Sequence, residues 1–332
     1  HRVDRRQRQM CIRDSSEPQV GHVISSYALG VVVGAPVLAL LGSRLLRKHL
    51  LLLLMGVFAV GNLASALAPD YLTLMMFRFF AGLPHGAYFG VAMLVAASMA
   101  APHKRAKAVS RVLMGLSVAI LIGNPLATWL GQSVSWRYAF ALVSVIALAT
   151  VAMIALLLPV DRSEVRSSPI SELRAFNRAP IWLALGIGSI GFAGMFCVFS
   201  YMAPTLLEVT RVSPGMIPVA MAIFGVGCIL GNMAGGWLFD RLQFKSVAWI
   251  LLWSALVLLV LPVATQSIWT MLPAILALGT IAALSPALQT HLMDVATGAQ
   301  TLAAASNHAA FNIANALGPV SYTHLTLPTI YS

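Results

Sequence analysis

Two stretches of this chain, residues 22–99 and residues 219–296, align with each other at a constant offset of 197 positions. In both stretches, long apolar runs are interrupted at matching places. The identical residues that the offset brings together are mostly glycines and basic residues: Gly30 with Gly227, Gly34 with Gly231, Leu41 with Leu238, Arg44 with Arg241, Lys48 with Lys245, and Gly82 with Gly279. Such an internal repeat constrains the fold more than any single motif, because both halves must adopt the same arrangement of elements. The sequence therefore predicts two related halves.

The composition excludes a soluble globular protein. Of the 332 residues, 59% are hydrophobic and 9% are charged, whereas a soluble domain carries about 25% charged residues. A helix of about 20 apolar residues is long enough to cross a bilayer. The sequence contains nine such segments and a weaker tenth, at about residues 22–43, 49–68, 73–97, 109–133, 138–159, 180–206, 214–239, 247–265, 269–290 and 301–320. We therefore expect an all-α membrane protein in a lipid bilayer.

The net charge is +11, and the basic residues are distributed unevenly among the loops. Lys and Arg cluster in the loops at 43–49, 101–111, 161–179 and 240–246, whereas the intervening loops carry only Arg137 and Arg211. The positive-inside rule places the basic loops in the cytoplasm, so we expect no nucleic-acid partner. The three cysteines show no metal-ligand spacing, and neither a metal nor a cofactor is expected.

A polar connection at residues 161–179 separates the halves, and Pro169 followed by Ser171-Glu-Leu-Arg predicts a short amphipathic surface helix in it. We expect an N-terminal bundle over residues 16–160 and a C-terminal bundle over residues 180–320. Segment 180–206 has no counterpart in the first half, so the repeat predicts a helix before residue 22. The implied plan has six helices per half, of which helices 2–10 and part of helix 11 are present. Residues 1–15 and 321–332 differ sharply in composition and resemble translated adapter tails, so we expect them to be non-native.

Two loops at matching positions of the repeat carry small and charged residues. The second reads Gly236-Trp-Leu-Phe-Asp240-Arg241-Leu-Gln-Phe-Lys245, and the first reads Ala39-Leu-Leu-Gly-Ser43-Arg44-Leu-Leu-Arg47-Lys48. The first loop therefore has a serine where the second has its only acid.

Polar residues and a predicted bend interrupt the apolar segments. Arg78 would cost about 2.5–3.5 kcal/mol at the centre of a membrane helix, so it must face protein or a water-filled cavity, unless it snorkels to the headgroups. His85 lies two turns further on the same face. It either relays a proton or binds a substrate, or it is a satisfied polar residue of the bundle. Pro125 is expected to kink its helix, within the run Gly123, Asn124, Pro125 and Gly131.

Taken in this order, these motifs resemble those of the major facilitator superfamily, in its branch of drug and metabolite proton antiporters. The resemblance is greatest to the arabinose-efflux-permease-like group and covers residues 16–320. It implies the major facilitator fold, with two pseudo-symmetric six-helix bundles. It links Arg78 to proton coupling, with His85 as the second candidate, and makes the Pro125 region an antiporter-like motif of the fifth helix.

The resemblance also implies that the two loops form a cytoplasmic gate, in which the acid holds a charge pair and a helix dipole contributes. The gate candidates are Ser43, Arg44, Arg47, Lys48, Gly236, Asp240, Arg241 and Lys245. Asp240 alone keeps the acid, and its alternative interpretation is a solvated helix end.

None of the ten acidic residues lies in the middle of an apolar segment. The proton carrier is therefore expected either on the helix before residue 22 or at Arg78 and His85. A substrate cavity lined by apolar and amide groups suits a neutral or weakly amphipathic solute. The cavity candidates are Tyr27, Asn62, His85, Tyr88, Asn124, Phe196, Tyr201, Asn232, Gln289, Asn307 and Asn312.

The favoured function is secondary active transport, in which two bundles rock about a midplane site and export a small molecule (a drug, sugar or metabolite) against protons. We expect a monomer in the bacterial inner membrane. Two alternatives stay open: an uptake permease for a sugar or nucleoside, and a non-transporting membrane receptor. An enzyme is not expected, because the chain has no His-Glu-x-x-His, no Gly-x-Ser-x-Gly and no paired acids within helices. We expect residues 16–320 alone not to transport.

Overall fold

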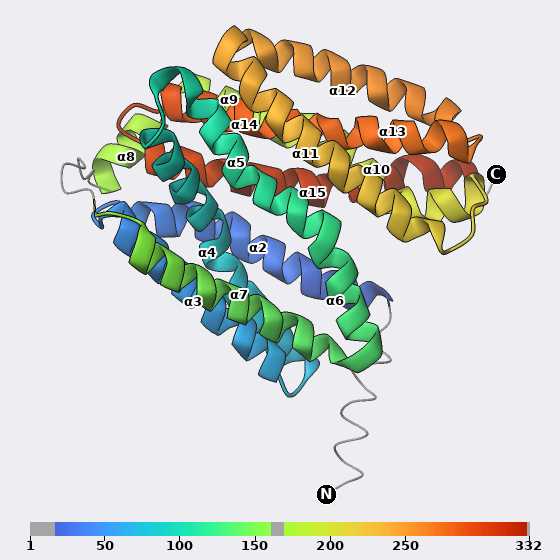
Figure 1. The fold of residues 1–332 in the computed structure, drawn as a ribbon, viewed down its shortest axis with the longest axis horizontal. Helices are drawn as coiled ribbons and strands as arrows, with labels where there is room; N and C mark the ends of the chain where they lie inside the picture. The colour runs from blue at the N-terminus through green and yellow to red at the C-terminus, as the bar shows by residue number, and fades with distance from the viewer. Residues whose placement is uncertain (1–16, 161–168, 331–332) are drawn as a thin grey trace, which may run out of the picture.

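A computed structural model describes residues 17–160 and 169–330, and the regular elements of this part of the chain are all helices, without strands (Figure 1). The first half contains α2 (Glu17–Gly42), α3 (Arg47–Leu67), α4 (Tyr71–Ser98), α5 (Arg105–Val118), α6 (Asn124–Leu130) and α7 (Trp136–Leu157). After it come α8 (Pro169–Phe176), α9 (Ala179–Gly191), α10 (Ala193–Pro204), α11 (Met216–Leu242), α12 (Lys245–Ala264), α13 (Ile268–Thr280), α14 (Leu284–Val295) and α15 (Gln300–Ile330). The all-α prediction is confirmed.

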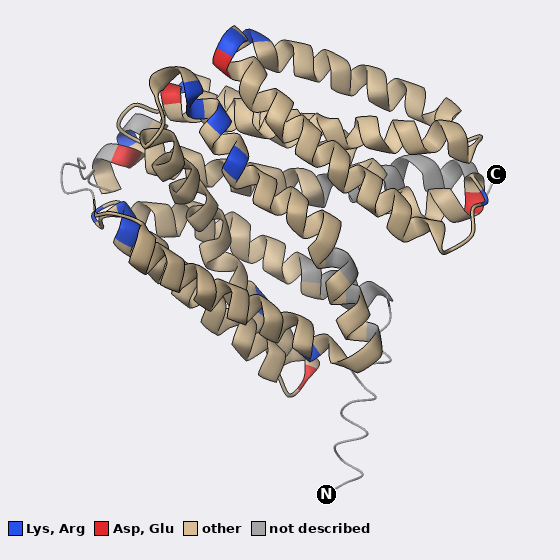
Figure 2. Cartoon of the chain, in the orientation of Figure 1, with Lys and Arg blue, Asp and Glu red and all other residues tan. Residues whose placement is uncertain are grey.

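Nine segments of the described residues are long and apolar enough to cross a membrane. They coincide with the nine predicted segments, with α9–α10 and α13–α14 each forming one span. Figure 2 shows most of the charged residues at one end of the helices and a few at the opposite end, while the helices between the ends are almost free of charge. We call the end with most of them the basic end; it contains Arg44, Arg47, Lys48, Lys104, Arg105, Lys107, Arg178, Arg241 and Lys245.

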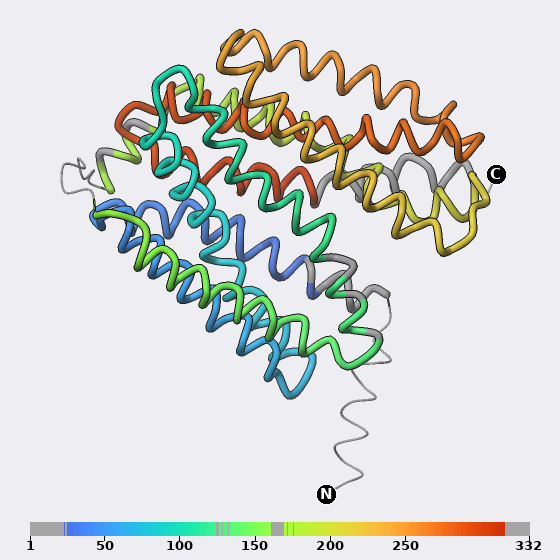
Figure 3. The backbone as a smooth tube through the Cα atoms, viewed as in Figure 1, coloured from blue at the N-terminus to red at the C-terminus, as the bar shows by residue number. Residues whose placement is uncertain are grey.

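Two groups of helices lie side by side (Figure 3). In the first half, α4 packs against α2 and α3, and α3 packs against α7. In the second half, α11 packs against α13, while α9 and α10 pack against α15. The halves meet along two seams, one where α15 contacts α2 and α4, and one where α5 contacts α11 and α14.

The repeat seen in the sequence is reproduced contact for contact in the structure. A Cβ atom on Gly30 would collide with the carbonyl oxygen of Phe79 and would lie 3.3 Å from the Cα atom of Gly82. A Cβ atom on Gly227 would collide with the carbonyl oxygen of Leu276 and would lie 3.0 Å from the Cα atom of Gly279. Each residue of the second set lies 197 positions after its counterpart in the first. Both halves therefore use small residues at the same place to bring two helices into close contact.

Apolar packing continues across the α2–α15 seam. One buried cluster contains Ala35 and Ala39 of α2, Val91 of α4, and Leu302 and Ala305 of α15. Close approach is again made possible by a glycine, because a Cβ atom on Gly90 would lie 2.5 Å from the backbone nitrogen of Ala305. In lipid, such van der Waals packing of small residues is a main source of helix association.

The segment predicted at 109–133 differs from a single kinked helix. It begins earlier, at Arg105, and π-helical turns at Ala119–Gly123 and Gly131–Ser135 flank α6. Pro125 lies in the first turn of α6. Because proline has no N–H group to donate, the wider π-helical turn before it accommodates the interruption. The short helix predicted after residue 168 is present as α8.

Candidate functional site

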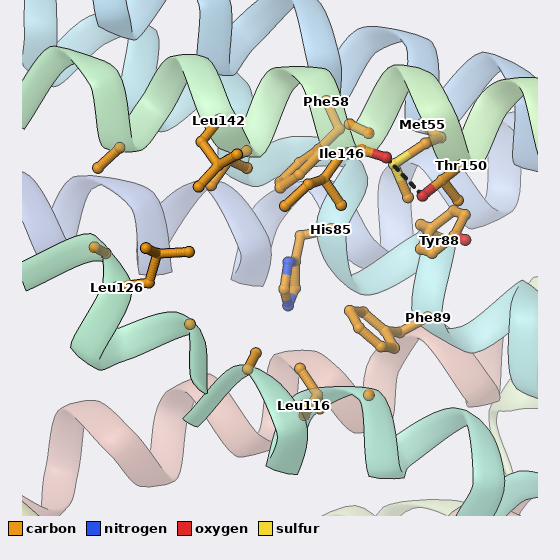
Figure 4. A pocket seen from close by; sticks show the side chains of 17 residues that line it. Met55, Phe58, His85, Tyr88, Phe89, Leu116, Leu126, Leu142, Ile146 and Thr150 are labelled. Carbon is orange, nitrogen blue, oxygen red and sulfur yellow. Dashed lines mark hydrogen bonds between the residues drawn. The ribbon is translucent and has the colours of Figure 1, made fainter. Parts of the chain in front are cut away.

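An apolar cavity of about 460 Å³ lies within the first half, between α3, α4, α7 and the α5–α6 region (Figure 4). Its walls are formed largely by apolar side chains, among them Met55, Phe58, Phe89, Leu116, Leu142 and Ile146. The polar side chains in the lining are His85, Tyr88 and Thr150, and the Thr150 hydroxyl donates a 2.9 Å hydrogen bond to the Ile146 carbonyl oxygen of its own helix. His85 and Tyr88, both predicted cavity residues, are therefore the polar groups most available to a solute.

The His85 ring is directed into this cavity (Figure 4), and a chain of contacts leads from it to Arg78. Tyr27 Oη and His85 Nδ1 share a hydrogen bond of 2.7 Å. The Arg78 guanidinium lies 4.2 Å from the centre of the Tyr27 ring. Tyr27 therefore connects the two residues that the sequence singled out for proton coupling.

Arg78 is directed towards protein rather than towards the headgroups. Besides Tyr27, its guanidinium lies over the Phe140 ring at 4.9 Å and donates a 3.2 Å hydrogen bond to Asn62 Oδ1. Asn62 is buried and in turn donates to the Phe58 carbonyl oxygen at 2.8 Å. Cation–π contacts and an amide partner together stabilise a guanidinium within an apolar bundle.

His308, on α15 of the second half, extends the cluster across the α4–α15 seam. Its ring centre lies 6.2 Å from that of His85, and Phe89 lies beside both rings, at 5.0 Å and 5.1 Å. His308 is 3% exposed, and Nε2 has no hydrogen-bond partner among the described residues. The sequence analysis missed His308 and Phe89, because nothing in a sequence pattern places the eleventh helix against the fourth.

Four of the other predicted cavity residues, Asn232, Gln289, Asn307 and Asn312, lie outside the cavity. Asn232 Nδ2 donates a 3.0 Å hydrogen bond to Ser117 Oγ across the α5–α11 seam. Asn307 Nδ2 donates to Gln289 Oε1 at 2.6 Å, and both residues are fully buried between α14 and α15. Asn312 donates to the His308 carbonyl oxygen at 2.9 Å.

Phe196 and Tyr201 lie on α10, and the side chain of Asn124 is outside the described residues. The structure thus gathers His85, Tyr88, Tyr27 and Arg78, with the amide of Asn62 beside Arg78. Among the described residues, no three His, Cys, Asp or Glu side chains lie close enough together to hold a metal ion.

The predicted gate residue Asp240 joins the two halves at the basic end. From α11, its Oδ1 and Oδ2 atoms accept hydrogen bonds of 3.0 Å from the backbone N–H groups of Ala106 and Lys107. These N–H groups belong to the first turn of α5, where a helix has no acceptors of its own. A carboxylate there also interacts favourably with the helix dipole.

The remaining gate candidates have different surroundings. Gly236 lets α11 approach α5, since a Cβ atom there would lie 2.9 Å from the Ala106 carbonyl oxygen. Arg241 lies over the Trp237 ring at 4.2 Å. Lys48 Nζ donates to the carbonyl oxygens of Ala155 and Leu158 at the end of α7.

Ser43 is buried, whereas Arg44 and Lys245 are exposed and Arg47 is half-buried. The motif residues Gly123 and Gly131 bound α6, with Gly123 ending one π-helical turn and Gly131 beginning the next. The Arg105–Asp294 ion pair, at 2.6 Å, adds a second contact from α5 to the other half.

Two repeated helical halves, with apolar spans and seams of small residues, define a multi-pass membrane protein of the carrier type. The profile of the family described as Major Facilitator Superfamily matches residues 11–321. The chain therefore belongs to the major facilitator superfamily, and like its members it is a membrane transporter rather than an enzyme.

Similarity to individual transport proteins supports the same family. The chain is 37% identical over 308 residues to the inner membrane transport protein YdhP of Escherichia coli K12, covering 92% of this chain and 79% of that protein. It is 36% identical over 327 residues to the AraJ protein of the same organism, covering 94% and 82%. It is 30% identical over 311 residues to a chloramphenicol resistance protein of Streptomyces lividans, covering 90% and 78%.

The fold is also similar to that of solved transporters. The crystal structure of the major facilitator FucP in the outward conformation superposes with a TM-score of 0.73, covering 95% of this chain and 85% of that one. At 15% sequence identity this similarity concerns the fold alone.

Proposed function

We propose that this protein is a proton-coupled exporter of a small, mostly apolar solute and works by alternating access. The observation that carries the proposal is the cavity with His85 in its wall, linked through Tyr27 to Arg78. A solute site in a bundle built from two repeated halves is typical of secondary transporters. The relatedness to a chloramphenicol resistance protein supports export as the direction.

The lining of the cavity favours a neutral amphiphile over a sugar. A sugar carries many hydroxyl groups, and each one buried without a partner is costly. The cavity offers mainly His85 and Tyr88 as hydrogen-bonding groups. A solute with a large apolar surface and few polar atoms therefore suits this site better.

In this proposal His85 takes up the proton and Arg78 sets its electrostatic surroundings. In a neutral His85 whose Nδ1 accepts from the Tyr27 hydroxyl, the ring proton lies on Nε2. Protonation of the ring makes Nδ1 a donor, so the Tyr27 hydroxyl hydrogen must rotate away while the hydroxyl oxygen accepts. The state of His85 would thus set the direction of the hydroxyl group of the residue on which Arg78 lies.

We further propose that the bundles correspond to residues 16–160 and 180–320, with residues 161–179 between them. In the second half, α9 and α10 cover α14 and α15. The repeat relates α14 to α4 and α15 to the α5–α6 region, and both α4 and the α5–α6 region form walls of the cavity.

Transport into inverted membrane vesicles tests the proposal, with chloramphenicol and L-arabinose as probes. An acidic vesicle interior is expected to drive chloramphenicol inwards, and an uncoupler is expected to abolish the uptake. Uptake that resists the uncoupler would refute antiport, and arabinose leaving together with protons would favour an uptake permease. The absence of any flux would favour a receptor.

A further inference from the structure

At the basic end, the repeat relates the contact between α5 and α11 to the contact between α15 and α2. The first contact has an acidic residue from the repeated loop, and the second has a serine at that position. Position 43 corresponds to position 240 at the offset of 197, and the first turn of α5 corresponds to the first turn of α15. Asp240 on α11 accepts two hydrogen bonds from the first turn of α5. Ser43 is the matching residue for the first turn of α15.

Ser43 does not take this role. It is 7% exposed, and its Oγ atom has no hydrogen-bond partner among the described residues. The N–H groups at the start of α15 nevertheless need acceptors, because the first turn of a helix has none of its own.

Glu172 supplies the acceptor from a different element. Its Oε2 atom accepts a 3.0 Å hydrogen bond from the backbone N–H group of Leu302, in the first turn of α15. The Glu172 side chain is 1% exposed, although it belongs to a short helix that the sequence predicts at the surface. Burial of a carboxylate is costly unless it is hydrogen-bonded, so this contact is a specific feature of the fold.

The element that carries Glu172 is positioned to act on both halves. Helix α8 contacts both α2 and α15, which form the seam that Ser43 leaves without an acid. Phe176, at the end of α8, packs against the apolar cluster shared by α2, α3, α4 and α15. In Figure 1, α8 lies at the basic end, beside the start of α15.

We propose that Glu172 replaces the missing acid of the first-half gate, so that α8 latches the α2–α15 seam while Asp240 latches the α5–α11 seam. This inference rests on the alternating-access function proposed above. Its consequence is that the Asp240 latch belongs to one of the two repeated halves, whereas the Glu172 latch belongs to the segment that joins them. Opening of the basic end then requires α8 to release the first turn of α15.

Spin labels at His49 and Leu242, exposed residues at the basic ends of α3 and α11, measure this opening in a cysteine-free full chain. Glu172→Ala is expected to raise the ratio of open to closed populations roughly tenfold, as the loss of one charge-assisted hydrogen bond predicts. Amide exchange at the start of α15 should become faster, while that of α5 should not. Glu208→Gln is the matched control, because Glu208 is exposed and lies away from both seams.

The decisive variant restores the acid where the repeat places it. Ser43→Asp in the Glu172→Ala background is expected to return the distances and the exchange at α15 towards those of the parent chain. Glu172→Ala distances that match those of Glu208→Gln would overturn the proposal, as would a Ser43→Asp variant without rescue. Neither readout needs a substrate, so a latch that is confirmed in a protein without transport would refute only the proposed function.

Discussion

Replacing Asp240 tests whether the α5–α11 seam stabilises one arrangement of the two halves. Its two oxygens accept 3.0 Å hydrogen bonds from Ala106 and Lys107. Loss of a helix-capping side chain costs about 0.5–2 kcal/mol, and loss of the charge at a helix N-terminus adds about 0.3–1 kcal/mol. Because Asp240 is half-buried, we take about 1.5 kcal/mol for Asp240→Ala from these ranges. Since the cap joins different halves, this energy belongs to the closed basic end alone.

The expected result is a shift of roughly tenfold towards the open basic end, read as longer distances between labels at His49 and Leu242. Asp70→Ala is the matched control. Asp70 caps α4 through a 2.9 Å hydrogen bond from the backbone N–H group of Thr73, but donor and acceptor lie in the same half. Its loss should lower stability without changing the open-to-closed ratio. Equal shifts in the two variants, or none with Asp240→Ala, would refute the reasoning.

Two further substitutions test other parts of the structure. Arg78→Lys keeps the charge but loses the planar stacking on Tyr27 and Phe140, so transport driven by a pH gradient should fall about tenfold if stacking contributes about 1–2 kcal/mol. Gly227→Ala should lower the thermal unfolding midpoint in detergent, because overpacking at the Leu276 carbonyl costs about 1–3 kcal/mol.

A contradicting result for Arg78→Lys and a control for Gly227→Ala can both be named. Full transport by Arg78→Lys would show that the stacking does not contribute to the cycle. Gly115→Ala is the control for Gly227, because nothing lies within 4 Å of a Cβ atom there. An equal fall of the midpoint in both glycine variants would contradict the packing argument.

Much of the fold could be predicted because the repeat is a local pattern with a geometric consequence. The pairing of Gly30 with Gly227 in the sequence appears in the structure as two equivalent helix contacts. Apolar length fixed the number of spans among the described residues. The break at Pro125 was predicted as a kink, but the π-helical turns on both sides depend on packing that no single residue specifies.

The site was predicted less completely, because His308 meets the rest of it across the contact between α4 and α15. Arg78 and His85 share one helix, so their spacing indicated a common face. His308 lies 223 positions beyond His85 in the sequence, and only the packing of α15 on α4 brings it close. Glu172 is a similar case: its helix could be predicted, whereas its burial depends on a contact with Leu302.

Coupling of solute to protons in reconstituted vesicles tests the central claim most directly. An imposed pH gradient should drive chloramphenicol against its concentration gradient, and chloramphenicol added alone should drive protons the other way. His85→Asn should keep downhill chloramphenicol exchange and lose the proton movement, because the asparagine amide keeps a hydrogen-bonding group in the cavity wall while the titrating ring is removed. Uphill transport unchanged in His85→Asn, or chloramphenicol flux without proton movement in the parent protein, would contradict the account.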